Sequence, residues 1–192
     1  KLSGTDNWGN AQKMLDLLAS ARARGIAIDC DQYPYVAASN PLKNLFPVWL
    51  QEGGVDAMLT RLGDMDVRDR LRREIEAEGL NNFGRIPDWG AIRVSISPDQ
   101  PQYAGRTIAD IAAERGADGF TTALDYIVED RAQTRVLVSS ISEDDVRSFI
   151  RSPNVLVGSD GNSVAPYGTT GQGKPHPRFY GTFARILGHY VR

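Results

Sequence analysis

The chain has 192 residues, of which 41% are hydrophobic and 24% are charged, with 22 Lys and Arg against 24 Asp and Glu. This composition is typical of a globular domain and excludes extensive disorder, a collagen-like repeat and a small disulfide-stapled fold. Because the charge is balanced and no apolar run approaches about 20 residues, we expect neither a nucleic-acid partner nor a membrane partner.

The first quarter of the chain predicts a helix, a short strand and a loop. Apolar residues recur at helical spacing across 10–24, and Gly25 ends this pattern. The apolar segment 26–30 is a strand candidate that follows the helix after a tight turn. Residues 31–47 contain three prolines and are expected to form a loop at the carboxyl end of that strand.

Cys30 is the only cysteine, so an internal disulfide is excluded and a reducing compartment is favoured. Its neighbours Asp29 and Asp31 disfavour a thiolate, which makes a nucleophilic cysteine a poor interpretation. We therefore expect a small half-buried side chain at this position, in a cytoplasmic protein.

The middle of the chain is predicted to be mainly helical. The pattern from 45 to 79 is helical but is broken at Gly53 and at Gly63. Further elements are expected as a strand at 92–96 and helices at 107–115 and 120–129.

The last third changes to alternating strand and helix. It predicts a strand at 136–138, a helix from the capping residue Ser142 to Arg151, a second strand at 154–158, a polar loop at 159–178 and a final helix. A strand, helix and strand within about 25 residues is typical of a βαβ unit, so the two strands are expected to be parallel and buried on both faces. The sequence therefore predicts an α/β fold.

Three polar clusters follow predicted strands: Asp31–Tyr35, Ser139–Ser140 and Gly158–Gly161. The carboxyl ends of parallel strands are where α/β folds bind ligands, so we expect the clusters to converge. Asp160 lies just past an apolar strand, where a carboxylate can act as a general base or a metal ligand. An aspartate that only caps the turn is the structural alternative.

The segment 174–178 reads Lys-Pro-His-Pro-Arg, and its prolines hold the chain extended before the final helix. Arg178 at that position is suited to grip a carboxylate with two N–H donors, although an arginine in a proline-rich loop is also commonplace. The preceding run, 168–175, approaches the phosphate-binding pattern G-x-x-x-x-G-K-[ST] but ends in Pro175. Proline has neither hydroxyl nor N–H, so we interpret this run as a flexible loop over the site.

The chain has two histidines, His176 and His189, and lacks the motifs H-x-H, H-E-x-x-H and C-x-x-C. We interpret His189, in the final helix, as an ordinary surface or core histidine. A complete zinc site is not expected from these residues.

Several of these segments together resemble, in order, the second half of the N-acyl-D-amino-acid deacylases, which belong to the metal-dependent amidohydrolase superfamily. They are KLSGTDNWG at the start, DQYPY at 31–35, GRTIADIA at 105–112, GSDG at 158–161 and HPRFYGTF at 176–183. The resemblance implies part of a (β/α)₈ TIM barrel, covering its strand 7–8 region, in a zinc enzyme that hydrolyses N-acyl-D-amino acids to a carboxylate and a D-amino acid.

The resemblance also implies roles for individual residues. Asp160 matches the aspartate that takes a proton from the attacking water and passes it to the leaving amine, with a weak or shared metal contact. Arg178 matches the arginine that grips the substrate carboxylate. Tyr33, Tyr35 and Ile141 would line the substrate pocket. The metal ligands proper would precede residue 1, and Lys1 matches the lysine of the S-H-x-K motif next to one of them.

Residues 1–43 and 135–192 would then belong to the barrel, and 44–134 to a mainly helical insertion covering its mouth. On this interpretation the chain alone is inactive, is the carboxyl-side part of a larger enzyme, and can self-associate through open strand edges. Two alternatives stay open. One is another amidohydrolase, similar to dihydroorotase or hydantoinase. The other is a non-catalytic α/β module that binds an anion with the 168–178 loop.

Overall fold

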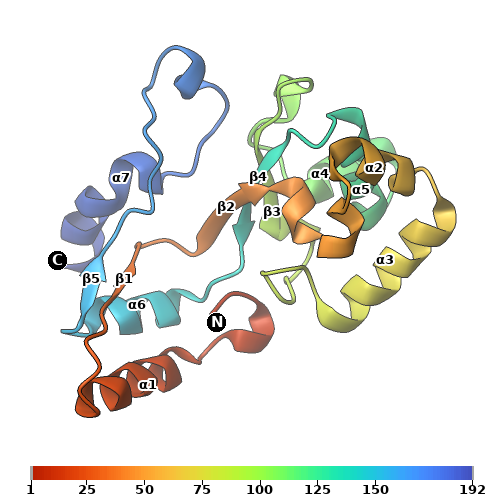
Figure 1. Cartoon of the computed structure of the whole chain (residues 1–192). Helices are drawn as coiled ribbons and strands as arrows, with labels where there is room; N and C mark the ends of the chain where they lie inside the picture. The colour runs from red at the N-terminus through yellow and green to blue at the C-terminus, as the bar shows by residue number, and fades with distance from the viewer. Residues whose placement is uncertain (1, 192) are drawn as a thin grey trace.

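The computed structural model describes residues 2–191 and has an α/β fold in which the elements form two groups (Figure 1). One group is a three-stranded sheet with its helices, and we call it the core group. It contains β2 (Ala37–Pro41), β3 (Ile92–Ile96), β4 (Arg135–Ser139), α2 (Gly54–Leu62), α3 (Met65–Glu78), α4 (Ile108–Arg115) and α5 (Gly119–Glu129).

The second group, which we call the strand-pair group, is built on two short parallel strands. It contains α1 (Ala11–Ala23), β1 (Cys30–Gln32), α6 (Glu143–Arg151), β5 (Val155–Val157), α7 (Arg178–Arg185) and a π-helical turn (Ile186–Tyr190). The register pairs Cys30 with Val155 and Gln32 with Val157. Asp145 of α6 accepts hydrogen bonds from the backbone N–H groups of Gly9 at 2.8 Å and Ala11 at 3.0 Å, which fixes the start of α1 against α6.

The helices of the core group begin and end where the sequence predicts. Thr107 and Asp110 form a reciprocal capping box at the start of α4, and Gly116 ends that helix in the left-handed conformation. Asp118 caps α5 by accepting from the Thr121 N–H. Burial raises the pKa of Asp118, but hydrogen bonds from Thr121 and Arg72 outweigh it and hold that pKa at about 2.

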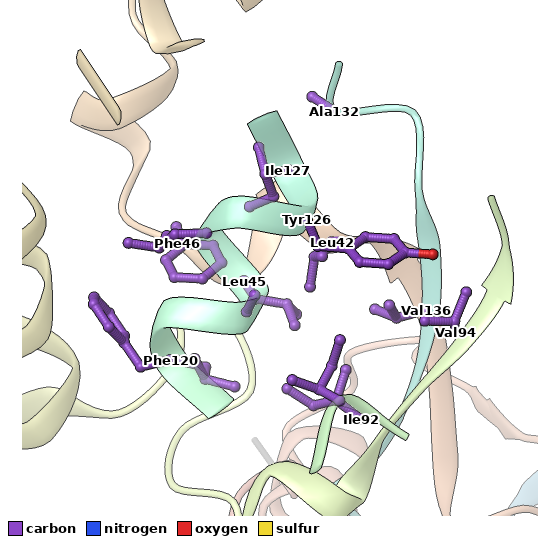
Figure 2. Packing of buried hydrophobic residues seen from close by; sticks show 14 of the residues in the cluster. Leu42, Leu45, Phe46, Ile92, Val94, Phe120, Tyr126, Ile127, Ala132 and Val136 are labelled. Carbon is purple, nitrogen blue, oxygen red and sulfur yellow. The ribbon is translucent and has the colours of Figure 1, made fainter. Parts of the chain in front are cut away.

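The apolar core lies between the three-stranded sheet and α5 (Figure 2). Strand residues Ile92, Val94 and Val136 are fully buried, as are Leu45 and Tyr126 on the facing elements. Every member of this core cluster lies between Leu42 and Val138. The strand-pair group therefore lies outside the main hydrophobic core.

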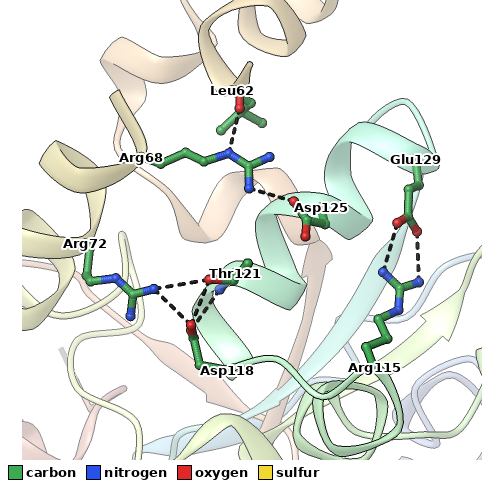
Figure 3. Close-up of polar contacts among 8 residues, drawn as sticks. All are labelled: Leu62, Arg68, Arg72, Arg115, Asp118, Thr121, Asp125 and Glu129. Carbon is green, nitrogen blue, oxygen red and sulfur yellow. Dashed lines mark hydrogen bonds and ion pairs between the residues drawn. The ribbon is translucent and has the colours of Figure 1, made fainter. Parts of the chain in front are cut away.

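Ion pairs connect the helices on the outer side of the core group (Figure 3). Arg68 of α3 pairs with Asp125 of α5 at 2.6 Å, Arg72 pairs with Asp118 at 3.0 Å, and Arg115 of α4 pairs with Glu129 at 2.8 Å. These pairs are partly exposed, so each is worth no more than about 1 kcal/mol. They fix helix orientation, and the buried apolar side chains supply most of the stability.

The predicted βαβ unit is wrong. β4 pairs antiparallel with β2 on one side and β3 on the other, so it has no edge left for a parallel partner. β5 instead pairs with β1 in the second sheet. The predicted burial on both faces is wrong as well, because Leu156 in β5 is 64% exposed.

Two boundaries near the start of the chain also differ from prediction. The strand expected at 26–30 begins only at Cys30, and the expected loop 31–47 contains β2. Asn40 and Pro41 disfavour a strand, but β2 is an edge strand, where a missing backbone N–H is tolerated. Cys30 is half-buried with a free thiol, as expected.

An apolar stripe lies exposed on the last helical segment. Tyr180, Phe183, Leu187 and Val191 recur at helical spacing and are all exposed. Among the described residues, no helix is long and apolar enough to cross a lipid bilayer.

Candidate functional site

A cavity of about 280 Å³ lies at the carboxyl ends of β1 and β5. Its lining residues are Asp31, Gln32, Tyr33, Ile141, Gly158 and Asp160. Two of the three polar clusters of the sequence thus meet here, because parallel pairing brings the ends of β1 and β5 to the same edge. Of the residues singled out from the sequence, Tyr33, Ile141 and Asp160 share this cavity.

Asp160 follows β5 with its backbone in the left-handed region, at φ 44°. Only glycine adopts this conformation freely, and asparagine and aspartate tolerate it better than other residues. The side chain is 72% exposed, so one face of the carboxylate is open to solvent. A strained backbone that presents an exposed carboxylate to a cavity is typical of functional sites.

Arg178 is the partner of Asp160 and lies behind it, outside the lining of the cavity. Its Nη2 is 2.9 Å from Asp160 Oδ2, and its Nε donates to the Asp160 carbonyl oxygen at 2.9 Å. The guanidinium carbon lies 4.8 Å from the centre of the Tyr33 ring, and the Arg178 side chain is only 7% exposed. A guanidinium has five N–H donors, and because Tyr33 is a further side-chain hydrogen-bond partner, at most two are left for other acceptors.

The two tyrosines singled out from the sequence occupy different places. Tyr33 lines the cavity, and burial raises its pKa although the Arg178 charge opposes this. Tyr35 does not line the cavity. Its hydroxyl donates to the Pro177 carbonyl oxygen at 3.5 Å, and Arg185 lies over its ring. The roles expected for both residues stay predictions.

His176, for which the sequence predicts no role, connects the cavity to α7 through Tyr33 and Arg178. Its side chain is buried, with Nε2 2.8 Å from the Ala37 carbonyl oxygen and Nδ1 accepting from the Arg178 backbone N–H at 3.0 Å. Both bonds go to backbone groups, so no motif spacing could have revealed them.

The Ser139–Ser140 cluster does not join the cavity, which corrects the expected three-way convergence. The Ser140 carbonyl oxygen accepts from the Gly4 N–H and from Trp8 Nε1, and its hydroxyl lies 2.7 Å from that of Ser3. The cluster belongs to the antiparallel β4, and it fixes the N-terminal turn instead.

The 168–175 run has its backbone already engaged. The Lys174 N–H donates to the Ser95 carbonyl oxygen at 2.8 Å, and the Ser95 hydroxyl donates to the Lys174 carbonyl oxygen at 2.9 Å. The run is therefore attached to β3, and the Lys174 amide is not available to a phosphate. A larger hollow of about 560 Å³ beside α3 contains none of the predicted site residues.

The residues from 2 to 191 contain no group of three His, Cys, Asp or Glu side chains placed to hold a metal ion. Asp160 can offer one oxygen, and that carboxylate is already paired with Arg178. His189 is half-exposed and lies 3.3 Å from Arg147, away from the cavity. Lys1, matched to the lysine beside a metal ligand, lies outside the described residues. The side chains present therefore do not form a zinc site by themselves.

No protein-family model matches the chain. Over all 192 of its residues the chain is 27% identical to a D-aminoacylase of Alcaligenes xylosoxydans xylosoxydans. It is also similar to the crystal structure of the N-acyl-D-glutamate deacylase of Bordetella bronchiseptica, with a TM-score of 0.63 and 26% identity over 99% of the chain. That relative is described as a complex with zinc and a phosphonate that mimics the tetrahedral intermediate.

The resemblance to the N-acyl-D-amino-acid deacylases is confirmed. A third relative, a D-aminoacylase structure described as defining a novel subset of amidohydrolases, gives a TM-score of 0.61 at 27% identity over the whole chain. The chain spans about 29% of the length of the curated D-aminoacylase and 30% of this solved one. The similarity to the N-acyl-D-amino-acid deacylases thus covers this entire sequence and less than a third of each relative.

Proposed function

We propose that the chain is a segment of a metal-dependent amidohydrolase that hydrolyses the amide bond of N-acyl-D-amino acids. Water adds to the acyl carbon, the carbon–nitrogen bond breaks, and the products are a carboxylate and a free D-amino acid. The similarity to D-aminoacylases along the whole chain supports this reaction class. The observation that carries the proposal is the exposed Asp160 carboxylate at the cavity where β1 and β5 end.

Asp160 is the proposed proton carrier of the reaction. It accepts a proton from the attacking water and delivers it to the nitrogen that leaves, as general acid–base catalysis requires. Its open face lies toward the cavity, and Arg178 holds the other side of the carboxylate at 2.9 Å.

Arg178 is the proposed binding group for the substrate carboxylate. Because Asp160 uses two of its five N–H donors and Tyr33 is a third partner, up to two donors are left for a substrate carboxylate that enters beside Tyr33. Tyr33 and Ile141 line the space for the substrate side chain, and Tyr35 supports the region from outside the cavity. Fixing the carboxylate, the scissile carbonyl and the side chain would select the D-enantiomer.

The proposed fold of the whole enzyme is a (β/α)₈ barrel in which β1 and β5 are neighbouring strands of the strand 7–8 region. Their parallel pairing supports this assignment. The proposed barrel part is residues 1–43 and 135–192, and the proposed insertion is 44–134, which is mainly helical and contains α2 to α5. β2 and β4, at the inner ends of the barrel part, form one sheet with β3 of the insertion, so they would connect the insertion to the barrel.

Zinc is the metal described for the Bordetella relative. For this chain we propose that the main metal-holding residues lie outside 2–191 and that Asp160 adds one weak or shared oxygen. The 192 residues alone would then be inactive. A cytoplasmic location and self-association through open strand edges complete the proposal.

The decisive experiment uses the complete gene product with N-acetyl-D-methionine as substrate. Asp160→Asn is the best test, since asparagine accepts the left-handed backbone but cannot carry the proton. We expect kcat to fall at least about 100-fold. Asp144→Asn, which removes an exposed carboxylate outside the cavity, is the matched control. An unchanged kcat in Asp160→Asn would show that Asp160 is not the proton carrier.

The substrate class is tested by the same preparation. Hydrolysis of N-acetyl-D-methionine, with little activity on its L-enantiomer or on a cyclic amide such as dihydroorotate, supports a deacylase. The reverse preference would favour the alternative amidohydrolases. Binding of inorganic phosphate by the 192-residue chain would favour an anion-binding module, which the engaged Lys174 amide argues against.

A further inference from the structure

The Arg178–Asp160 pair depends on where α7 begins, because Arg178 is the first residue of that helix. The preceding residue, Pro177, has no side-chain group that could cap the helix with a hydrogen bond. The cap comes instead from His176, whose Nδ1 accepts from the Arg178 backbone N–H at 3.0 Å. The position of the guanidinium is therefore coupled to the position of one imidazole ring.

The two partners of His176 allow only one arrangement of its ring protons. A carbonyl oxygen can only accept, so Nε2, at 2.8 Å from the Ala37 carbonyl oxygen, has to carry the hydrogen. A backbone N–H can only donate, so Nδ1 has to be unprotonated toward Arg178. The neutral Nε2–H tautomer is the only form that satisfies both bonds.

The ring of His176 is also enclosed by aromatic side chains. Tyr35 and Tyr33 meet it edge-on, with ring centres at 5.3 Å and 5.9 Å, and Phe179 lies at 6.3 Å. The residue as a whole is only 1% exposed. Its contacts come from the segment after β1, from the first residue of β2 and from the start of α7.

Charge at this position would disturb the site. A protonated ring would lose its acceptor for the Arg178 N–H and would place a positive charge beside the guanidinium. Burial lowers the pKa of His176 to about 4, with the Ala37 carbonyl and Asp160 opposing this and Arg178 adding to it. The neutral form is thus the one that the surroundings favour.

We infer that His176 is a positioning residue, which acts through the Arg178 backbone to set the Arg178–Asp160 pair at the rim of the cavity. The kinetic part of this inference rests on the proposed function. A spectroscopic readout on the 192-residue chain tests the geometry separately.

Two substitutions separate the effects of the two hydrogen bonds that the His176 ring makes. In His176→Asn the side-chain oxygen lies where Nδ1 was and can accept from the N–H two residues ahead, as asparagine does in turns. In His176→Gln the longer amide can reach the Ala37 carbonyl but loses the bond to Arg178. The matched control is His189→Asn, which replaces the half-exposed histidine away from the cavity.

In the complete enzyme we expect KM for N-acetyl-D-methionine to rise about tenfold in His176→Gln, which corresponds to the loss of one hydrogen bond. His176→Asn should stay within about threefold of the parent, a difference of less than one hydrogen bond. The outcome that overturns the inference is an equal rise in KM for both variants, because His176 would then serve packing alone.

Nitrogen NMR of the 192-residue chain tests the inference without activity. We expect His176 in the Nε2–H form, and a slowly exchanging Arg178 Nε–H signal in the parent and in His176→Asn that is lost in His176→Gln. An Nδ1–H form, or an Arg178 signal that is the same in both variants, overturns the inference. If the parent enzyme fails to hydrolyse the substrate, the proposed function fails and these spectra still decide the geometry.

Discussion

Mild acid should loosen the start of α7 through a single residue, His176. The ring is neutral and buried in the folded chain, and its pKa is lowered from 6.5 to about 4. Below pH 6.5 His176 binds a proton when the start of α7 is open and stays neutral when it is closed. Acid therefore favours the open state. The stabilising contribution of His176 is complete above pH 6.5 and is lost as the pH falls toward 4.

The size of this effect follows from the two pKa values. The full difference between 6.5 and about 4 corresponds to about 3 kcal/mol. Between about pH 7.5 and about pH 5, roughly 2 kcal/mol of this is lost, which is about a 30-fold change in the opening equilibrium. Buried or hydrogen-bonded carboxyl groups such as Asp118, with a pKa of about 2, lose their contribution mainly at lower pH, so this window isolates the histidine.

Amide hydrogen exchange in the 192-residue chain measures the opening directly. The reporters are the N–H groups of Arg178 and Gly181, which bond to His176 Nδ1 and to the Pro177 carbonyl oxygen. After correction for the intrinsic pH dependence of exchange, their protection should fall about 30-fold between about pH 7.5 and about pH 5. Amides of α5, which packs in the core, are the internal control and should show no such step.

The reasoning is refuted if the protection of Arg178 and Gly181 is flat across this window. It is also refuted if His176→Asn, which has no group to protonate, shows the same fall as the parent chain.

Three other predictions concern the core, the ion pair and the strand edge. Leu45→Ala, at a fully buried position, should lower the free energy of unfolding of the core group by about 2–5 kcal/mol in urea titrations followed by circular dichroism. Arg178→Lys in the complete enzyme should raise KM for N-acetyl-D-methionine about tenfold, since lysine cannot hold Asp160 and a substrate carboxylate with one planar group. The 192-residue chain should self-associate in analytical ultracentrifugation, and Leu156→Lys on exposed β5 should shift it toward monomer.

Each of these has a result that contradicts it. A loss below about 1 kcal/mol in Leu45→Ala would mean that the site is not closely packed. An unchanged KM in Arg178→Lys would remove the carboxylate-binding role. A chain that sediments as a monomer at all concentrations would show that the exposed strand pair and the α7 stripe do not associate.

The sequence predicts local structure well where a side chain acts on its own neighbourhood. Thr107 and Ser142 cap their helices with hydroxyl groups, and Gly116 ends α4, so these boundaries follow from short-range chemistry. The existence of β3, β4 and β5 also follows from apolar runs. The pairing of these strands does not follow from the sequence, because one partner of β4 is β2, about a hundred residues earlier in the chain.

The same distinction between local and long-range structure applies to the candidate site. The clusters around Tyr33 and Asp160 were visible because polar residues follow apolar strands, and parallel pairing brings them into one cavity. His176 could not be recognised in this way. One of its bonds goes to the Ala37 carbonyl, 139 residues away, and a backbone carbonyl leaves no trace in the sequence.

The parallel pairing of β1 with β5 has a consequence for the order of folding. Cys30 and Val155 are far apart in the sequence, and closing a loop of about 125 residues directly would cost roughly 4 kcal/mol of chain entropy. Pairing of β2 with β4 reduces this cost, because it brings residues 37 and 139 together and leaves only short connections to β1 and β5. We therefore expect the core group to form first and the strand pair to assemble on it. Asp160 and Tyr33, which share the cavity, would be among the last residues of the chain to meet.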